Sequence, residues 1–195
     1  ASDLGFNRYT DQWQELIDDS DVELISICAP NALHRDISIA ALEAGKHVWC
    51  EKPMAMSLTD AEDMVTAARS SFRKTIVGYN YIKNPAVTHA QRLISDGMIG
   101  RITGFHGRYD VDNEADENQP YSWRLSRDRS GTGAIADILS HLLSVAHFIT
   151  NSEVTNVVAD IDVVHRQRPD PADPSVSREV DNDDTVAALI HFANG

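Results

Sequence analysis

The chain has 195 residues, 42% of them hydrophobic, which is enough for one good core or two small ones. Its formal net charge of −13 at pH 7 argues against a nucleic-acid partner, because an acidic surface repels a phosphate backbone. No apolar run approaches the roughly 20 residues of a membrane-spanning helix, and the first residues show no signal peptide. We therefore expect a cytoplasmic protein with no nucleic-acid or membrane partner.

Helices and strands alternate in the first part of the chain. The predicted elements are a short helix capped by Thr10, a strand over 22–29, a helix over 33–44 ended by Gly45, a strand over 47–50, a helix from the capping box Thr59–Glu62 to Ser70, and a strand over 75–78. This order predicts a parallel, right-handed α/β layer over residues 1–82.

The pattern changes near residue 82. The predicted elements are a helix from Asn84-Pro85 to Gly97, a half-exposed strand over Arg101–Val111, a polar loop over 112–130, an apolar helix, a strand over 154–164, a surface loop over 166–181, a strand over 185–192 and a hairpin turn at Asn194-Gly195. The pattern therefore predicts a second, partial α/β domain over residues 83–195. Its sheet is expected to be mixed, largely antiparallel and incomplete.

Two cysteines, Cys28 and Cys50, each end an apolar run of β-like composition. Two buried thiols fit a reducing compartment better than a disulfide framework, although a single bridge between neighbouring strand ends is the alternative. The sequence predicts no metal site.

The apolar helix opens with Gly131 and Gly133 and carries Asp137 and His141. Residues four apart lie on one helix face, so the carboxylate is placed to orient the imidazole as a proton acceptor. A solvated surface pair is the alternative at this spacing.

Two predicted strand ends carry polar residues. Pro30-Asn31, with His34 close behind, ends one strand, and Glu51-Lys52-Pro53 ends the next. In open α/β sheets ligands bind outside the carboxyl ends of the strands, so the sequence predicts a binding crevice there. Turn chemistry at Asn31 and a solvated Glu-Lys pair are the alternatives.

The combination resembles the Gfo/Idh/MocA family, which is named after glucose–fructose oxidoreductase and inositol dehydrogenase. The residues that carry the resemblance are Ala29–His34, Gly45–Pro53, Val77–Tyr81, Gly97–Ile102, Trp123-Arg124 and the glycine-opened helix with Asp137 and His141. The resemblance covers most of the chain in the expected order. It implies that residues 1–82 are part of a Rossmann-type dinucleotide-binding domain, and that residues 83–195 are part of a C-terminal α/β domain for substrate binding and oligomerisation.

The resemblance implies oxidation or reduction of a sugar, inositol or related polyol with NAD or NADP, in a homo-oligomer that is a dimer or tetramer. It implies cofactor contacts by Pro30, Asn31, His34, Glu51, Lys52, Trp123 and Arg124. It implies substrate contacts by Asn80, Tyr81, Asp137 and His141. The implied catalytic residues are Lys52, Asp137 and His141: the histidine takes the hydroxyl proton, the aspartate orients it and the lysine stabilises the developing alkoxide.

The sequence departs from the family at three points. It contains no Gly-x-Gly-x-x-Gly loop, so we expect this chain to be part of a longer protein and to be inactive alone. Leu139 stands where relatives commonly have Gly, and Ser144 where they commonly have Asp, which puts a second orienting carboxylate for His141 in doubt. A non-catalytic dinucleotide-binding regulator of the same family, and a bare interaction fragment, are the alternative functions.

Overall fold

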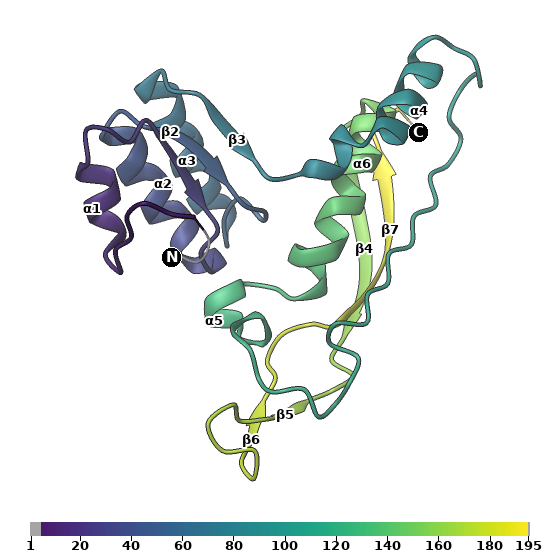
Figure 1. Ribbon diagram of the computed structural model, residues 1–195. Helices are drawn as coiled ribbons and strands as arrows, with labels where there is room; N and C mark the ends of the chain where they lie inside the picture. Colours follow the sequence, from purple (N-terminus) through teal and green to yellow (C-terminus); the bar gives the residue numbers. More distant parts are fainter. Residues whose placement is uncertain (1–4, 195) are drawn as a thin grey trace. The chain divides into compact units, whose positions relative to one another are not determined.

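The computed structural model describes residues 5–194 and is shown in Figure 1. Contacts within the chain divide it into two compact units, one ending at Gly78 and the other beginning at Tyr79. Each unit is described by itself.

The first unit is a parallel α/β layer. Its sheet has the order β1 (Leu24–Ile27), β2 (His47–Cys50) and β3 (Thr75–Val77), with all neighbours parallel. Helices α1 (Trp13–Asp18), α2 (His34–Glu43) and α3 (Leu58–Ser71) complete the unit. The predicted parallel sheet is confirmed. Gly45 ends α2 as predicted, with a φ of +76°. Only glycine adopts this left-handed backbone conformation easily.

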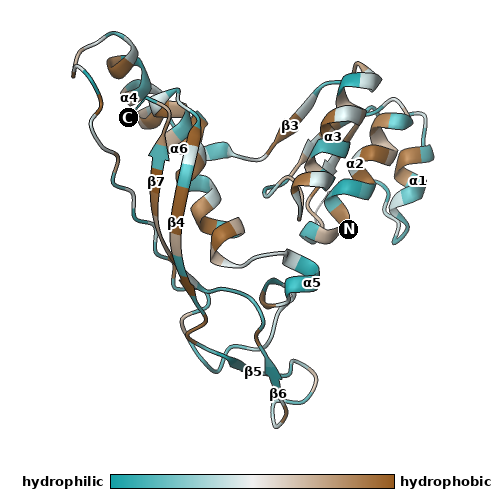
Figure 2. Cartoon of the chain, turned by 180° about the vertical axis from the view of Figure 1, so that it is seen from behind, coloured by the Kyte–Doolittle hydropathy of each residue, from teal (hydrophilic) through white to brown (hydrophobic). Residues whose placement is uncertain are grey.

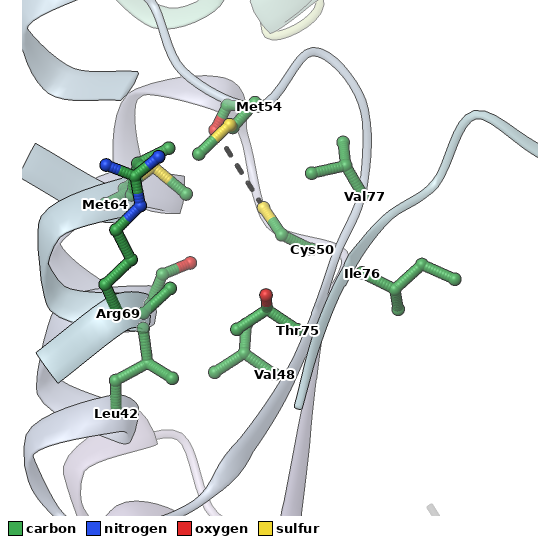
Figure 3. Close-up of a pocket in the computed structure, with 12 residues that line it drawn as sticks. Leu42, Val48, Cys50, Met54, Met64, Arg69, Thr75, Ile76 and Val77 are labelled. Carbon is green, nitrogen blue, oxygen red and sulfur yellow. Dashed lines mark hydrogen bonds between the residues drawn. The ribbon is translucent and has the colours of Figure 1, made fainter. Parts of the chain in front are cut away.

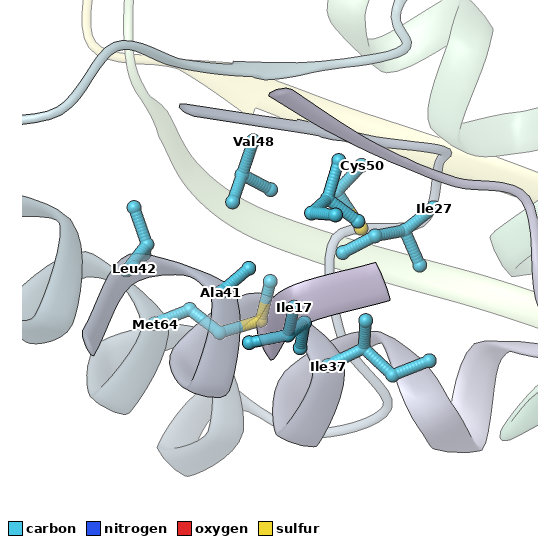
Figure 4. Close-up of a cluster of buried hydrophobic side chains, with 9 residues drawn as sticks. Ile17, Ile27, Ile37, Ala41, Leu42, Val48, Cys50 and Met64 are labelled. Atoms are coloured by element: carbon cyan, nitrogen blue, oxygen red, sulfur yellow. The ribbon is translucent and has the colours of Figure 1, made fainter. Parts of the chain in front are cut away.

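The core of this unit lies between the sheet and its helices (Figure 4). Alternate strand residues face the helices and the others face away, as the two-residue period of a strand requires. The buried cluster comprises Ile17, Ile25, Ile27, Ile37, Ala41, Leu42, Val48, Cys50 and Met64. Each large side chain fully buried here contributes about 1.5–3 kcal/mol of transfer free energy.

The cap of α3 is displaced from its predicted position. Ser57, not Thr59, caps the helix: its Oγ accepts from the Asp60 N–H at 3.1 Å and donates to the Asp60 carboxylate at 2.7 Å. The expected capping box at Thr59–Glu62 was therefore wrong by two residues. The physical reason is that Ser57, two residues earlier, has Asp60 three residues after it, so its hydroxyl bonds both the Asp60 N–H and the Asp60 carboxylate.

The second unit combines helices with two antiparallel strand pairs. Its helical elements are η3 (Asn80–Lys83), α4 (Pro85–Ser95), η4 (Trp123–Leu125), α5 (Arg127–Ser130), the π-helical turn η5 (Ile135–Leu139) and α6 (Ser140–Thr150). Its strands are β4 (Val154–Asp162), β5 (Gln167–Pro169), β6 (Ser177–Glu179) and β7 (Thr185–Phe192), paired β4 with β7 and β5 with β6. Figure 2 shows hydrophobic residues along both β4 and β7.

Several expectations for this unit need correction. Arg101–Val111 forms no strand, because within residues 5–194 β4 and β7 pair only with each other and leave this segment without a ladder partner. The expected loop over 166–181 contains the β5–β6 hairpin. The expected hairpin turn reaches Gly195, which lies outside the described residues.

The helical stretch Arg127–Thr150 is, by length and composition alone, long and apolar enough to cross a bilayer. The sequence expectation that no run approaches this length was therefore wrong. The core helix of a soluble protein passes the same test, and α6 packs against α4 and η3. Most residues of α6 are half-buried, so only part of its apolar surface packs within the unit.

Candidate functional site

The carboxyl ends of β1 and β2 form the first part of the candidate site. Because Ile27 and Cys50 are paired in the ladder, the segments that follow them leave the sheet at the same edge. Pro30 and Asn31 begin the 3-10 turn η2 (Asn31–Leu33), whereas Glu51 and Lys52 lead into a cis peptide bond before Pro53. The structure thus brings the predicted residues of both strand ends to one edge of the first unit.

His34 joins these two segments. Its ring is fully buried, with Nδ1 2.9 Å from the Pro53 carbonyl oxygen and Nε2 3.0 Å from the Ala29 carbonyl oxygen. Carbonyl oxygens only accept, so a neutral imidazole donates to one of them and an imidazolium donates to both. With both ring nitrogens beside backbone oxygens, His34 holds the two segments together, and its cofactor contact stays a prediction from the family resemblance.

Glu51 lies against the end of β3. A Cβ atom built on Gly78 would lie 3.0 Å from both Glu51 carboxylate oxygens, tighter than nine in ten real Cβ contacts. The Lys52 backbone N–H points to the same carboxylate at 3.4 Å. Gly78 therefore leaves the space that this carboxylate occupies, and the side chains of Glu51 and Lys52 remain half-buried at the sheet edge.

The second unit carries its own group of candidate site residues, on the glycine-opened helix. Asp183 holds its start: Oδ1 accepts from Gly133 N–H and Oδ2 from Ile135 N–H, both at 2.8 Å, and its backbone oxygen accepts from Ala134 N–H at 2.9 Å. Three backbone donors that a helix start leaves unpaired are satisfied by one residue. A Cβ on Gly133 would overlap the Asp183 carbonyl oxygen, so glycine is required there.

The helix places Asp137 in a π-helical turn and His141 in the first turn of α6. Single π turns are frequent at functional sites. His141 is 7% exposed, and the Tyr81 ring stacks on its imidazole with centroids 4.2 Å apart and planes 23° apart. Tyr79 meets the same imidazole edge-on at 6.0 Å, and burial raises the pKa of the Tyr79 hydroxyl. His141 is thus a largely enclosed imidazole between two aromatic rings, unlike a solvated surface histidine.

Trp123 and Arg124 lie in η4, where the Arg124 guanidinium sits 4.7 Å from the Trp123 ring centroid. Burial raises the pKa of the nearby Glu114 carboxyl; the charges of Arg168 and Arg124 lower it, and that of Asp137 raises it further. Glu114 is therefore within electrostatic reach of both the Trp-Arg pair and Asp137, which places these three predicted residues in one charged neighbourhood.

Buried polar groups fix this neighbourhood. The Arg168 side chain is 1% exposed and donates to the backbone oxygens of Glu114 and Asp116, and Asn182 donates to the Arg124 carbonyl at 2.8 Å. Sequence reasoning missed Glu114, Arg168, Asn182 and Asp183. The short acidic cluster at Asp181–Asp184 was the one available signal, but nothing local shows that it caps a helix some 50 residues earlier.

The first unit also holds an apolar cavity of about 430 Å³ between β2–β3 and α2–α3 (Figure 3). Its lining includes Leu42, Val48, Cys50, Met64 and Ile76, but none of the predicted site residues. Burial raises the pKa of the Cys50 thiol to about 11, so the thiol is neutral there. Both cysteines are free, which excludes the alternative of a bridge between strand ends. Cys50 is buried but Cys28 is exposed, so the expectation of two buried thiols was wrong for Cys28. The cavity is a feature of the core rather than of the candidate site.

Comparison with known proteins matches both halves of the chain to models of one family. A family model described as the GFO/IDH/MocA C-terminal domain matches residues 87–195, and one described as an oxidoreductase family with an NAD-binding Rossmann fold matches residues 1–79. Levoglucosan dehydrogenase of Pseudarthrobacter phenanthrenivorans is 37% identical over the whole chain, which covers 53% of that relative. Inositol 2-dehydrogenase of Salmonella typhimurium is 29% identical over 74% of the chain, which corresponds to 40% of that relative.

Solved structures agree with the sequence matches. Levoglucosan dehydrogenase in complex with NADH and levoglucosan has a TM-score of 0.93 and 39% identity, with 100% of this chain and 51% of that chain covered. Aldose-aldose oxidoreductase from Caulobacter crescentus has a TM-score of 0.72 and 31% identity, with coverage of 94% and 51%. The chain spans about half the length of the curated relatives it matches. With family models matching both of its halves, the chain belongs to the Gfo/Idh/MocA family of oxidoreductases.

Proposed function

We propose that the whole protein is an NAD- or NADP-dependent oxidoreductase that transfers a hydride between the nicotinamide and a sugar, inositol or related polyol. The names of its relatives, levoglucosan dehydrogenase, 1,5-anhydro-D-fructose reductase and inositol 2-dehydrogenase, support this substrate class. The observation that carries the proposal is His141, a largely buried imidazole on a helix whose start is fixed by Asp183.

The residues at the carboxyl edge of the first unit suit a dinucleotide. The edge offers the backbone turn at Pro30-Asn31, the half-buried side chains of Glu51 and Lys52, and at Gly78 a position without a side chain. Such an edge is where parallel α/β sheets bind nucleotides. In the proposal these residues hold the cofactor together with Trp123 and Arg124. When bound, the nicotinamide supplies the hydride acceptor or donor.

The proton chemistry belongs to the protein. In the oxidation direction a ring nitrogen of His141 accepts the substrate hydroxyl proton, and Asp137 orients the imidazole and stabilises its charged form. The Lys52 ammonium stabilises the alkoxide that develops as the proton leaves. Asn80 and Tyr81, both in η3, are proposed to contact the substrate. Their element directly follows the Gly78 boundary of the first unit.

We also propose that the protein is a cytoplasmic homo-oligomer, a dimer or tetramer. The two free thiols suit a reducing compartment. The paired residues Val158 and Leu189, on one face of the β4–β7 sheet, are exposed by 72% and 67%, and exposed apolar side chains of this kind suit an interface between copies. Light scattering of the full-length protein tests this state, and a monomer at high concentration would contradict it.

A substrate screen tests the enzymatic proposal. Full-length protein is mixed with NAD⁺ or NADP⁺ and a panel that includes levoglucosan, myo-inositol and simple aldoses, and reduced nicotinamide is followed by its absorbance. We expect reduction with at least one member of the panel. Calorimetric binding of a dinucleotide without turnover of any polyol or sugar would instead support the non-catalytic regulator.

A further inference from the structure

The contacts of His141 extend beyond the two aromatic rings that touch it. Tyr81 stacks on the imidazole face at 4.2 Å, and Tyr79 lies edge-on to it with an interplanar angle of 86°. One ring on the face and another at the edge restrict rotation of the imidazole about its Cβ–Cγ bond. The orientation of His141 therefore depends on what holds the stacked ring of Tyr81.

Tyr81 is held at its far end by Tyr109. The two hydroxyl groups are hydrogen-bonded, and the rings meet at 81° with centroids 5.8 Å apart. Tyr81 and Tyr109 are each 37% exposed, so core packing alone does not fix either ring. The hydroxyl–hydroxyl bond is thus a specific restraint on a ring that otherwise has rotational freedom.

Tyr109 is itself fixed to the same unit. It belongs to the segment 101–111, which forms no strand and approaches α6 at Gly107: a Cβ on Gly107 would lie 3.2 Å from Leu142 Cδ2. Gly107 is thus close to Leu142, the residue that follows His141 on α6. Tyr109 therefore bridges back from this segment to η3 through the Tyr81 hydroxyl.

Resting on the proposed function, we propose that Tyr109 is a positioning residue for the proton acceptor. By bonding the Tyr81 hydroxyl it holds that ring against His141 and so fixes the orientation in which the imidazole receives the substrate proton. Small errors in the placement of a reacting group lower the rate of the chemical step while leaving ligand binding largely intact. The effect of losing Tyr109 is therefore expected in kcat rather than in the KM of the cofactor.

Two phenylalanine variants isolate the bond in the full-length protein. Tyr109→Phe and Tyr81→Phe each remove one hydroxyl and keep the ring, and each is expected to lower kcat by about tenfold. The double variant is expected to be no worse than Tyr81→Phe alone, because Tyr109→Phe has no further effect once the Tyr81 hydroxyl that it bonds is gone. Tyr9→Phe, at a residue 83% exposed in the other unit, is the control and keeps wild-type kcat. A double variant whose loss equals the product of the single losses overturns the proposal.

An NMR measurement tests the positioning without reference to turnover. The ring-proton signals of His141, assigned by their absence in His141→Asn, are expected to be shifted upfield by the stacked Tyr81 ring. The shift should disappear in Tyr81→Leu and shrink in Tyr109→Phe. An unshifted wild-type signal, or one that Tyr109→Phe leaves unchanged, overturns the proposal even if the enzyme is active. Absence of turnover in the wild type with the expected shifts present would contradict the proposed function while supporting the positioning.

Discussion

The Tyr81 ring lies face to face with the His141 imidazole, 4.2 Å away and inclined by 23°. These two residues are 60 positions apart and entered the sequence analysis for different roles, Tyr81 as a substrate contact and His141 as the proton acceptor. Their direct contact means that a residue proposed to contact substrate also shapes the environment of the proposed acceptor. The same contact connects η3 to the helix that Asp183 caps.

The Asp183 cap should contribute to the stability of the folded protein. Asp183→Ala removes two carboxylate bonds to the helix start, and we expect a loss of about 1–2 kcal/mol in the free energy of unfolding. Asp160→Ala, on the exposed side of β4, should change it by less than about 0.5 kcal/mol. Denaturant unfolding monitored by circular dichroism measures both. Equal effects of the two variants would contradict the capping role.

Two glycines with different surroundings give a second comparison. Gly133→Ala places a Cβ onto the Asp183 carbonyl oxygen, and we expect a destabilisation of about 1–3 kcal/mol from the forced displacement. Gly104→Ala is the matched control, since its Cβ would meet only the His106 ring at 3.8 Å, an ordinary contact. The melting temperatures of the two variants check the difference. A Gly133→Ala protein as stable as the wild type would contradict the close packing of Gly133 against the Asp183 carbonyl oxygen.

The two thiols should differ in reactivity. Burial raises the pKa of Cys50 to about 11, so roughly one thiol in a thousand is ionised at about pH 8, whereas Cys28 is exposed. A disulfide reagent should therefore modify Cys28 rapidly and Cys50 only after denaturation. Cys28→Ser should abolish the rapid phase. A rapid phase that survives in Cys28→Ser would contradict the enclosed position of Cys50.

Glu114 should make stability depend on pH. Burial, the largest cause, raises the pKa of Glu114 in the folded protein above the ordinary value. At a pH between these two values, the folded state therefore binds more protons than the unfolded state. The contribution of this group is therefore fully present at low pH and falls as pH rises through the ordinary and then the raised value. Relative to wild type, Glu114→Gln should gain stability at about pH 7 but not at about pH 3. Thermal unfolding at both pH values, with exposed Glu117→Gln as control, measures this, and an equal change at both would contradict it.

Local signals predicted the first unit well. The strands β1 and β2 are marked by short apolar runs, and the end of α2 is marked by Gly45. These signals are local in the sequence, so the parallel sheet could be predicted from it. The same reasoning failed at Arg101–Val111, because alternation describes a half-buried surface but does not supply a partner strand. It also missed β5 and β6, whose proline- and charge-rich sequence suits a hairpin as well as a loop.

The candidate site divides in the same way. Residues beside strand ends, such as Asn31 and Lys52, and the Asp137/His141 spacing are visible in the sequence. Contacts between distant positions are not: Asp183 with Gly133 and Tyr109 with Tyr81 carry no local signature. His34 shows the same limit, since a polar residue beside a strand end is fully buried and holds two loops together.

The kinetics of His141→Asn in the full-length protein test the central claim most directly. Asparagine keeps a polar side chain of similar reach but does not accept the proton, so kcat for polyol or sugar oxidation should fall by about 10²–10⁴-fold. Cofactor affinity should stay nearly unchanged, because the proposal places most cofactor contacts on residues of the first unit. A His141→Asn protein with wild-type turnover would contradict the assignment of His141 as the proton acceptor.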